Sequence, residues 1–505
     1  MTSISRRTLL LGSAAGALSL AGLTGCSPSG TAVAASSDSV RRAERARRTT
    51  GQRTVTTRLA PRAAALDLGG LTVNTWAYGD TLPGPLLRVT AGDLLRVTVD
   101  NGLPTDTSIH WHGIALRNDM DGVPGMTQAS IGAGEQFVYE FTAPDPGTYF
   151  YHPHSGVQLD RGLYGVLVVD DPRERGDYDV EWIVTLDDWI DGTGRTPDDV
   201  LAGLRRSAGP GAGGMGHGSM GMGGMGRGSS GMGGTGERMT SPMLGGAGDV
   251  AYPHYLVNGR LPSAPAELEA RTGQRARIRI VNAGADTAFR VALGGHRLTI
   301  THSDGFPVQP LTADSLLVGM GERYDVLVTL KDGVFPMVAS AEGKRGNGLA
   351  LVRTGAGSAP SASVRPAELG GQVAMGMDLT ATAEATLLRR PVDRTHDLVL
   401  SGSMADYRWT LNGRTFEQAD PLEVREGERV RLRFRNMSMM FHPMHVHGHT
   451  FGLAHGGSRK DTVMVRPMQM VAVDLDADNP GQWATHCHNI YHAEAGMMTT
   501  LSYRA

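Results

Sequence analysis

The sequence predicts an all-β protein built from three similar domains, and a repeated strand pattern is the first reason. Three segments begin with glycine, carry arginine four residues later, alternate apolar with other residues and close on asparagine: residues 92–101, 273–282 and 427–436. Such alternation is typical of a strand with one buried face. Copies this far apart in the chain indicate repeated domains rather than a solenoid.

A second repeat relates the first of these domains to the third. Residues 146–154 (Pro-Gly-Thr-Tyr-Phe-Tyr-His-Pro-His) match residues 480–488 (Pro-Gly-Gln-Trp-Ala-Thr-His-Cys-His) in register, with Pro153 in the position of Cys487. We therefore expect the first and third domains each to donate two histidine pairs to a shared interface, and only the third to build a single-copper site. The middle domain is expected to be a spacer without metal ligands.

Four histidine pairs with one residue between them follow the repeated strands: His110 and His112, His152 and His154, His445 and His447, and His486 and His488. In a strand, side chains two residues apart share a face, so each pair can present both imidazoles to one place. The middle domain has Val291 and Leu293 at the positions of His110 and His112. A lone pair is more often a surface feature, but four pairs in tight groups argue against chance. Eight imidazoles exceed the needs of one copper or zinc ion and suit a cluster of three coppers.

Cys487 lies between His486 and His488 and is the only cysteine expected in the folded body. Strand alternation places the two histidines on one face and the thiol on the other. With His442, His492 and Met497 it supplies a thiolate, two imidazoles and a thioether, the set typical of a blue copper electron-transfer site. A lone buried cysteine is otherwise usually a small hydrophobe. One strand would then join two metal sites by a short covalent path, which predicts electron transfer.

These motifs closely resemble the signatures of the multicopper oxidases. They are His-Trp-His-Gly (110–113), His-Pro-His-Ser (152–155), His-Pro-Met-His-Val-His-Gly (442–448) and His-Cys-His-x3-His-x4-Met (486–497). The resemblance covers roughly residues 51–505 and is greatest to three-domain bacterial oxidases of copper tolerance, and looser to laccases. It implies three consecutive cupredoxin-like domains, each a Greek-key β-sandwich, and four copper ions.

The same resemblance implies a role for each ligand. The type 1 copper ligands would be His442, Cys487, His492 and Met497; the type 2 ligands His110 and His445; and the ligands of the type 3 pair His112, His152, His154, His447, His486 and His488. Single electrons from a reductant would enter at the type 1 copper and pass through Cys487 to the cluster, where dioxygen is reduced by four electrons to two waters.

Dioxygen reduction consumes protons, so acids near the cluster are expected. Asp121 matches a family acid thought to serve this role, although a turn residue in Asp-Met-Asp-Gly is the alternative. Many bacterial relatives carry an acid directly after the second type 1 histidine. Here Ala493 occupies that place and Glu494 follows, so Glu494 is the second candidate.

The amino terminus resembles an export signal. Arg6 and Arg7 precede an apolar stretch, and Leu23-Thr-Gly-Cys26 resembles a lipobox that would acylate Cys26. We expect export by the twin-arginine route and a lipid-anchored protein of the periplasm or cell surface, with cleavage and secretion as the alternative. The expected division is a signal over 1–26, a flexible tether over 27–50, domains over 51–172, 173–355 and 385–505, a Gly/Met-rich insertion over 208–247 and a linker over 356–384.

Charge argues against nucleic-acid binding. The first 50 residues contain seven arginines and two acids, so against a total of −3 the remaining body carries −8. Beyond the signal, no stretch is long and apolar enough to span a bilayer. We expect a monomer that touches a membrane only through the lipid.

Methionines suggest the reductant, because thioethers suit cuprous copper. They occur in the insertion and at four positions near His442, namely Met437, Met439, Met440 and Met444, with Met375, Met377 and Asp378 as weaker candidates. Core packing is the alternative for the methionines near His442 and for Met375 and Met377. For the insertion, which we expect to bind copper transiently, the alternative is an inert disordered segment. The leading hypothesis is oxidation of cuprous, and also ferrous, ions; the others are a laccase acting on phenols and aromatic amines, and a copper-buffering surface protein that is not an enzyme.

Overall fold

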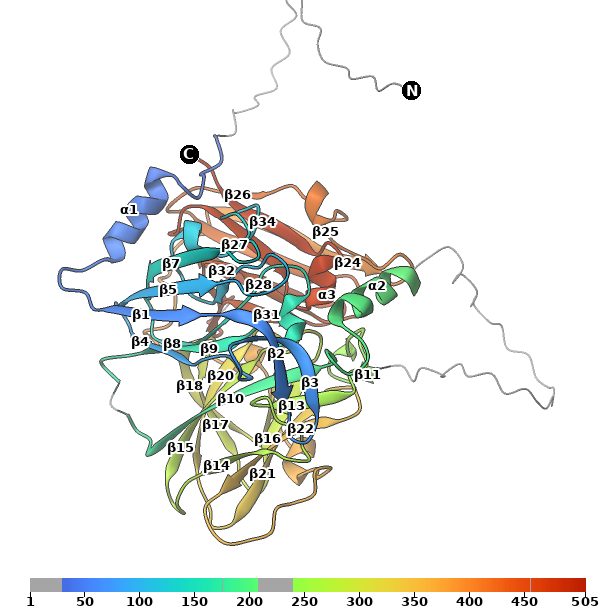
Figure 1. The fold of residues 1–505 in the computed structure, drawn as a ribbon. Helices are drawn as coiled ribbons and strands as arrows, with labels where there is room; N and C mark the ends of the chain where they lie inside the picture. The colour runs from blue at the N-terminus through green and yellow to red at the C-terminus, as the bar shows by residue number, and fades with distance from the viewer. Residues whose placement is uncertain (1–29, 175, 208–238, 455) are drawn as a thin grey trace, which may run out of the picture.

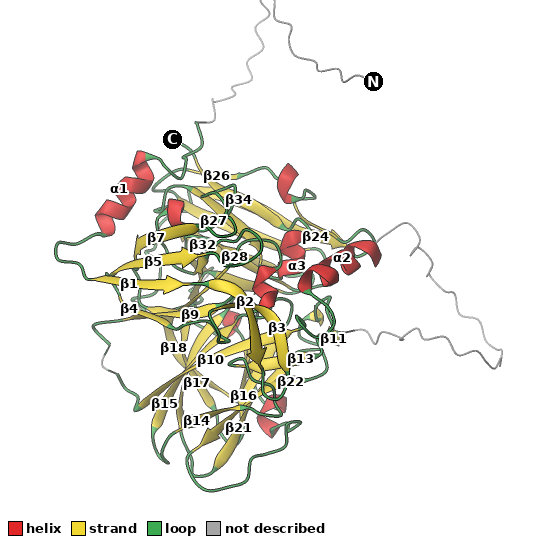
Figure 2. Ribbon diagram, in the orientation of Figure 1, coloured by secondary structure: helices red, strands yellow, loops and turns green. Residues whose placement is uncertain are grey.

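The computed structural model describes residues 30–505 except residues 175, 208–238 and 455. It is mostly β-structure, with the short α-helices α1 (Asp38–Arg47), α2 (Pro197–Ser207) and α3 (Ile490–Glu494) in the described part (Figure 2). Three domains, each with two main sheets, are confirmed. Figure 1 shows the first domain, blue to teal, against the orange and red third domain, with the green and yellow second domain below both.

The strands fall into sheets as follows, in spatial order. In the first domain, one sheet contains β1 (Thr54–Leu59), β5 (Leu94–Asp100) and β7 (Gln136–Thr142), and the other β4 (Leu87–Thr90), β9 (Gly165–Asp170), β8 (Gly147–His152) and β6 (His110–His112). A separate pair contains β2 (Pro61–Asp67) and β3 (Thr72–Tyr78).

In the second domain, one sheet contains β13 (His254–Val257), β10 (Val180–Trp189), β15 (Arg275–Asn282), β20 (Arg323–Thr329), β17 (Leu298–Ser303) and β18 (Phe306–Ala313). The other contains β14 (Ala266–Glu269), β22 (Asn347–Arg353), β21 (Val334–Ala341), β16 (Phe289–Leu293), β19 (Ser315–Val318) and β23 (Val373–Ala374). A small hairpin pairs β11 (Thr240–Ser241) with β12 (Gly245–Gly246).

In the third domain, one sheet contains β25 (Arg408–Leu411), β24 (Arg394–Ser403), β27 (Arg429–Asn436), β32 (Met470–Asp476), β29 (Phe451–Leu453) and β30 (Arg459–Lys460). The other contains β26 (Leu422–Val424), β34 (Met498–Tyr503), β33 (Gln482–Cys487), β28 (His442–Val446) and β31 (Thr462–Val465).

The repeated segments form equivalent strands. β5, β15 and β27 each pair in parallel with an earlier strand, β1, β10 and β24 respectively, and antiparallel with a later one, β7, β20 and β32. The closing asparagine is buried each time and donates to at least two backbone carbonyls. Asn436 Nδ2 lies 2.7 Å from Met440 O and 3.1 Å from Val465 O. Asn101 and Asn282 make the corresponding bonds, so this residue fixes the loop that leads to the next strand.

The prediction of a flexible tether over 27–50 is wrong for the described part, residues 30–50. Ser37 caps helix α1, and Val40 and Glu44, four residues apart, share its buried face. The Glu44 carboxylate accepts from the backbone N (3.1 Å) and Oγ1 (3.0 Å) of Thr142 in the first domain. Arg47 donates to Asn479 in the third domain at 3.0 Å. The composition indicated flexibility, but these contacts fasten an N-terminal arm across two domains.

Several predicted segments lie outside the described residues: the signal, with its Cys26 lipobox, and residues 208–238 of the insertion. Residues 239–250 are described and return the chain to β13. Within the expected linker, β23 extends a sheet of the second domain by pairing with β19. In the described part, no helix is both long and apolar enough to cross a membrane.

Candidate metal centre

The four histidine pairs meet between the first and third domains. β6 pairs antiparallel with β8, which places His110 opposite His152. β28 pairs antiparallel with β33, which places His445 opposite His486. Seven of the eight side chains are almost fully buried: His110, His112, His152, His445, His447, His486 and His488. His154 is partly buried. The structure therefore brings together all eight histidines that the sequence selects.

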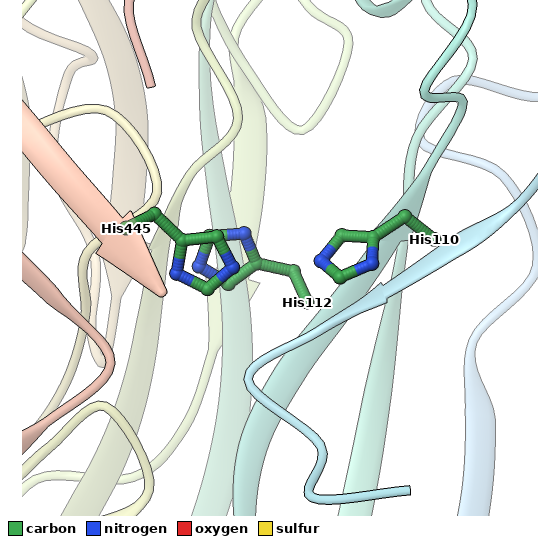
Figure 3. Close-up of side chains that lie close together, drawn as sticks. All are labelled: His110, His112 and His445. Carbon is green, nitrogen blue, oxygen red and sulfur yellow. The ribbon is translucent and has the colours of Figure 1, made fainter. Parts of the chain in front are cut away.

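Within this cluster, three groups each hold ligand nitrogens within 4.8 Å of one another. They are His112 with His152 and His488, His154 with His447 and His486, and His110 with His112 and His445. The first two correspond to the predicted type 3 pair, and the third contains both predicted type 2 ligands. Figure 3 shows the third group, in which the rings of His112 and His445 stack with centroids 3.7 Å apart. Every group takes residues from both outer domains.

The unused nitrogens of these rings test whether a metal fits. In six of the eight rings, one nitrogen faces a hydrogen-bond acceptor. The acceptor is Asp121 for His110 and His447, and Asp461 for His112 and His445. For His152 and His486 it is the carbonyl oxygen of the next residue. Nitrogens left buried without a partner include Nε2 of His110, His152 and His445, and Nδ1 of His112. An unpartnered buried nitrogen is costly, and a bound metal would remove the cost. The donor set fits copper.

Burial favours the neutral form of seven of these imidazoles. It is the largest cause that lowers their pKa, and neighbouring imidazoles lower the pKa further: His112, His152, His154, His445, His447, His486 and His488. The pKa of His486 falls to about 3. The neutral form is the one that binds a metal, so the cluster is in its binding form at neutral pH.

Two buried carboxylates hold the outer sides of the cluster. Asp121 accepts from His110 Nδ1 at 3.1 Å and from His447 Nδ1 at 2.9 Å, and thus ties a first-domain ligand to a third-domain ligand. Asp461 accepts from His112 Nε2 at 3.1 Å, and its backbone oxygen lies 2.9 Å from His445 Nδ1. Sequence reasoning missed Asp461. Its one signal is a charged pair, residues 460–461, directly before the apolar strand β31.

On the other face of β33, three of the four predicted type 1 ligands also converge: His442, Cys487 and His492. Cys487 Sγ lies 3.6 Å from His442 Nδ1 and 3.7 Å from His492 Nδ1, and the two nitrogens are 3.1 Å apart. All three side chains are fully buried. Met497 is buried too, and its backbone oxygen accepts from Cys487 N at 3.0 Å. The expected alternation along this strand is what the structure shows.

The strand also provides two short routes between the centres. Cys487 is covalently adjacent to His486 of one triad and His488 of the other. In addition, His486 Nδ1 lies 2.9 Å from Cys487 O. The group of His154, His447 and His486 is therefore connected to Cys487 by a hydrogen bond as well as through the backbone.

Groups that the sequence did not reveal cover the outer side of the Cys487 centre. Ser438 Oγ lies 2.8 Å from His442 Nε2, and Asp249 Oδ2 lies 3.0 Å from His492 Nε2. The Trp409 ring lies over His492 with centroids 4.1 Å apart. Asp249 belongs to the second domain and directly follows the Gly/Met-rich insertion. No sequence pattern marks it, because its contact depends on how distant segments pack.

Glu494, the second candidate acid, is half-buried on α3. It lines a small cavity with His154 and His486, of about 20 Å³, roughly enough for one water. Burial raises the pKa of its carboxyl, which favours the protonated form. Arg205 of α2 donates to the backbone oxygen of Glu494 at 2.7 Å and fixes this turn.

Two of the predicted substrate methionines are not accessible, which corrects their assignment. Met444 is fully buried, because β28 places it opposite Cys487, inside the third domain. Met375 is packed in an apolar cluster with Leu244 and Phe441. Asp378 accepts from the Met375 backbone N at 2.8 Å. By contrast, the exposed methionines of the predicted set are Met377, Met437 and Met439, and Met440 is partly buried.

Comparison with known proteins identifies this architecture. Three models described as multicopper oxidase match residues 62–174, 237–358 and 389–505. The chain is 50% identical over 486 residues to multicopper oxidase MmcO of Mycobacterium tuberculosis, covering 94% of this chain and 92% of that protein. It is 28% identical to copper resistance protein A of Escherichia coli, over 82% of this chain and 87% of the relative. This chain belongs to the multicopper oxidase family.

A solved structure supports the same fold. A multi-copper oxidase from Pseudomonas thermotolerans matches with a TM-score of 0.66 at 26% identity, over 90% of this chain and 100% of the other. The predicted cupredoxin-like domains are thereby confirmed. The protein is an oxidoreductase that uses copper, as its family does.

Proposed function

We propose that this protein holds four copper ions and oxidises cuprous ions, with ferrous ions as a second donor, in copper tolerance. Copper at these sites would supply one-electron redox chemistry that couples four donor oxidations to the reduction of dioxygen to two waters. One ion would be held by the Cys487 centre and three by the histidine cluster, with the ligand roles that the family resemblance implies.

The surface methionines are the observation that carries the choice of donor. Eight large hydrophobic side chains are exposed among the described residues, and six are methionines: Met377, Met404, Met437, Met439, Met468 and Met470. An exposed thioether contributes little to packing but is a soft ligand for cuprous copper. A surface selected only for solubility would not concentrate its exposed apolar groups in one residue type.

Two pairs of these residues, Met437 with Met439 and Met468 with Met470, lie on neighbouring backbone segments, because Asn436 N donates to Gln469 O at 2.9 Å. We call these four residues the methionine patch. Gly246 N donates to Met439 O at 2.9 Å. A Cβ on Gly245 would lie 2.6 Å from Pro467, next to Met468. The segment that ends the Gly/Met-rich insertion therefore lies on the patch.

The patch is one hydrogen bond away from the Cys487 centre. Ser438, between two patch residues, bonds His442, and Asp249, two residues after the insertion, bonds His492. An electron from an ion at the patch thus has a short path to His442 through Ser438. Both outer nitrogens are already bonded, which disfavours a phenol that must bond His442 or His492 directly.

Two acids beside the cluster are the candidates for proton supply, and their contacts differ. Glu494 can hold a proton beside the cluster cavity, because burial raises its pKa. Asp121 uses both carboxylate oxygens on histidines, so its contacts favour a positioning role.

Steady-state oxygen uptake with cuprous, ferrous and phenolic donors, side by side, tests the proposal. We expect the highest kcat/KM with cuprous ions. The double variant Met437→Leu/Met439→Leu should lower that value by about tenfold, equivalent to about 1.4 kcal/mol, and leave phenol oxidation unchanged. A better phenol rate, or equal loss for both donors, would favour the laccase alternative.

The role of the insertion is tested by deleting residues 208–238 rather than the whole predicted insertion, residues 208–247. Removing residues 208–238 spares residues 239–250, which hold Asp249 against His492. If the insertion delivers copper, this variant oxidises cuprous ions more slowly at low concentration and phenols at the normal rate. Unchanged cuprous oxidation would show that the insertion has no role in delivery. The storage alternative predicts negligible oxygen uptake by the fully loaded protein, contrary to its membership of a family of oxidases.

We propose in addition that the chain is exported by the twin-arginine route and acylated at Cys26. Replacing Arg6 and Arg7 by lysine should retain the protein in the cytoplasm, and Cys26→Ala should release it from the membrane fraction. Fractionation with detection of the lipid by mass spectrometry would check both.

A further inference from the structure

The second domain contributes none of the grouped ligands, yet one of its arginines reaches the copper cluster. Arg323 begins β20 and is fully buried. Its guanidinium donates from Nη1 and Nη2 to the two oxygens of Asp461, at 2.7 and 2.6 Å. This is a bidentate, charge-assisted pair, the geometry in which arginine holds a carboxylate most rigidly.

The same side chain contacts all three domains. Its Nε donates to Thr148 O of the first domain at 3.0 Å, and its Nη1 to Gly321 O of the second at 3.0 Å. Asp461 belongs to the third domain. A guanidinium has five N–H groups in a fixed plane, so these bonds define one position for it.

Asp461 transmits that position to the cluster. Its carboxylate faces His112 Nε2, its backbone oxygen faces His445 Nδ1, and Thr462 Oγ1 lies 3.1 Å from each of these nitrogens. His112 and His445 come from different domains, and their rings stack in Figure 3. Both rings depend on Asp461 for orientation.

Close packing around the pair shows that the fit is tight. A Cβ on Gly113, next to His112, would lie 2.4 Å from Arg323 Nη2 and 2.6 Å from Asp461 Oδ2. A Cβ on Gly321 would lie 2.9 Å from His488 Cγ and 3.0 Å from His112 Cε1. The second domain therefore forms a wall of the cluster, and the expectation of a mere spacer is incomplete.

A second buried contact strengthens this junction. Lys460 Nζ lies 3.1 Å from Asp304 and 3.3 Å from Glu322, both of the second domain. Asp304 Oδ2 in turn accepts from the backbone N of Asp461 and of Thr462, both at 3.2 Å. The backbone that carries Asp461 is thus also held by Asp304, whose other oxygen accepts from the backbone N of Arg323 at 2.9 Å.

We infer that Arg323 is a positioning residue for the copper held by His110 and His445 and for the neighbouring ion held by His112, acting through Asp461. This inference rests on the proposed copper cluster. The Cys487 centre should be independent of it, because its outer contacts are Ser438 and Asp249.

Arg323→Met, Arg323→Lys and a matched control, Arg279→Met, test the inference. Arg279 is also a buried second-domain arginine that bonds Thr148, at 2.8 Å, but its carboxylate partners are Glu181 and Asp325. Copper would be measured per chain against graded chelator. The blue absorption reports the Cys487 centre, and the resonance signal that remains after the paramagnetic signal of the blue copper is subtracted reports the copper of His110 and His445. Loss of a partner that orients metal-bound histidines costs about 10- to 100-fold in metal affinity.

We expect Arg323→Met to lose the resonance signal at about 10- to 100-fold lower chelator concentration while the blue colour persists, and Arg279→Met to keep both. Arg323→Lys should lose the signal at an intermediate chelator concentration, because lysine keeps the positive charge but cannot donate two parallel hydrogen bonds to the Asp461 carboxylate. If Arg323→Met does not fold, the comparison of Arg323→Lys with Arg279→Lys decides. Cluster affinities equal to those of the control would overturn the inference. Wild-type protein that takes up no copper would instead overturn the proposed function.

Discussion

Replacing Asp121 by asparagine separates its two candidate roles, proton donor and positioning residue. The carboxylate accepts two N–H groups, from His110 at 3.1 Å and His447 at 2.9 Å, and is fully buried. An asparagine of the same shape accepts one of them through its oxygen and points its NH2 group at the other histidine. One charge-assisted hydrogen bond, of about 1.5–3 kcal/mol, is lost.

That loss predicts copper binding about 10- to 100-fold weaker at the cluster, since about 1.4 kcal/mol corresponds to tenfold. Chelator titration with copper analysis measures it. Asp119→Asn is the control, because Asp119 is two residues away and is paired with Arg117 at the surface. If Asp121→Asn binds copper as tightly as the control but fails to reduce dioxygen, the positioning argument is refuted and proton donation is favoured. Normal copper and normal turnover would exclude both roles.

Three further outcomes follow from the described contacts. Cys487→Ser should abolish the blue absorption and all oxygen uptake, and turnover retained in that variant would contradict electron transfer through this strand. Burial alone would raise the pKa of the Asp325 carboxyl, but Arg277 and Arg279 lower it below its usual range. The ionised carboxylate therefore stabilises the folded protein at neutral pH, and this contribution to the free energy of unfolding is lost as the pH falls below about 5. Urea unfolding of Asp325→Asn should show about 3–5 kcal/mol less stability at pH 7 and a flatter decline in acid; an unchanged decline would rule Asp325 out as its cause. Glu44→Ala removes two hydrogen bonds between the N-terminal arm and the first domain and should cost about 2–3 kcal/mol of unfolding free energy, whereas an unchanged value would mean that the arm adds no stability.

The ligands were predictable because they occur as patterns. The glycine-to-asparagine repeat locates equivalent strands, and a histidine pair with one intervening residue identifies a shared face whatever the neighbours are. These rules hold within one strand, so they transfer directly from sequence to structure.

The groups around the ligands were not predictable in the same way. Arg323, Asp461, Asp249 and Ser438 are single residues whose role depends on segments far away in the chain. The prediction for Met444 was wrong for a related reason. Its neighbours His442 and His445 are candidate ligands, but strand pairing places Met444 opposite Cys487, with its side chain buried inside the domain. The prediction of a flexible N-terminal arm was wrong because the overall composition of the segment does not reveal the contacts of single residues, here Val40 and Glu44, that hold it in place.

Construction of the cluster from both ends of the chain has a consequence for biogenesis. Half of its eight imidazoles lie at or beyond His445, so a nascent chain that stops before this position lacks them. Neither end of the polypeptide can assemble the histidine cluster alone, and loading with metal has to wait until synthesis and domain docking are complete. A cell that makes this enzyme must therefore supply copper wherever the finished fold resides, rather than during translation.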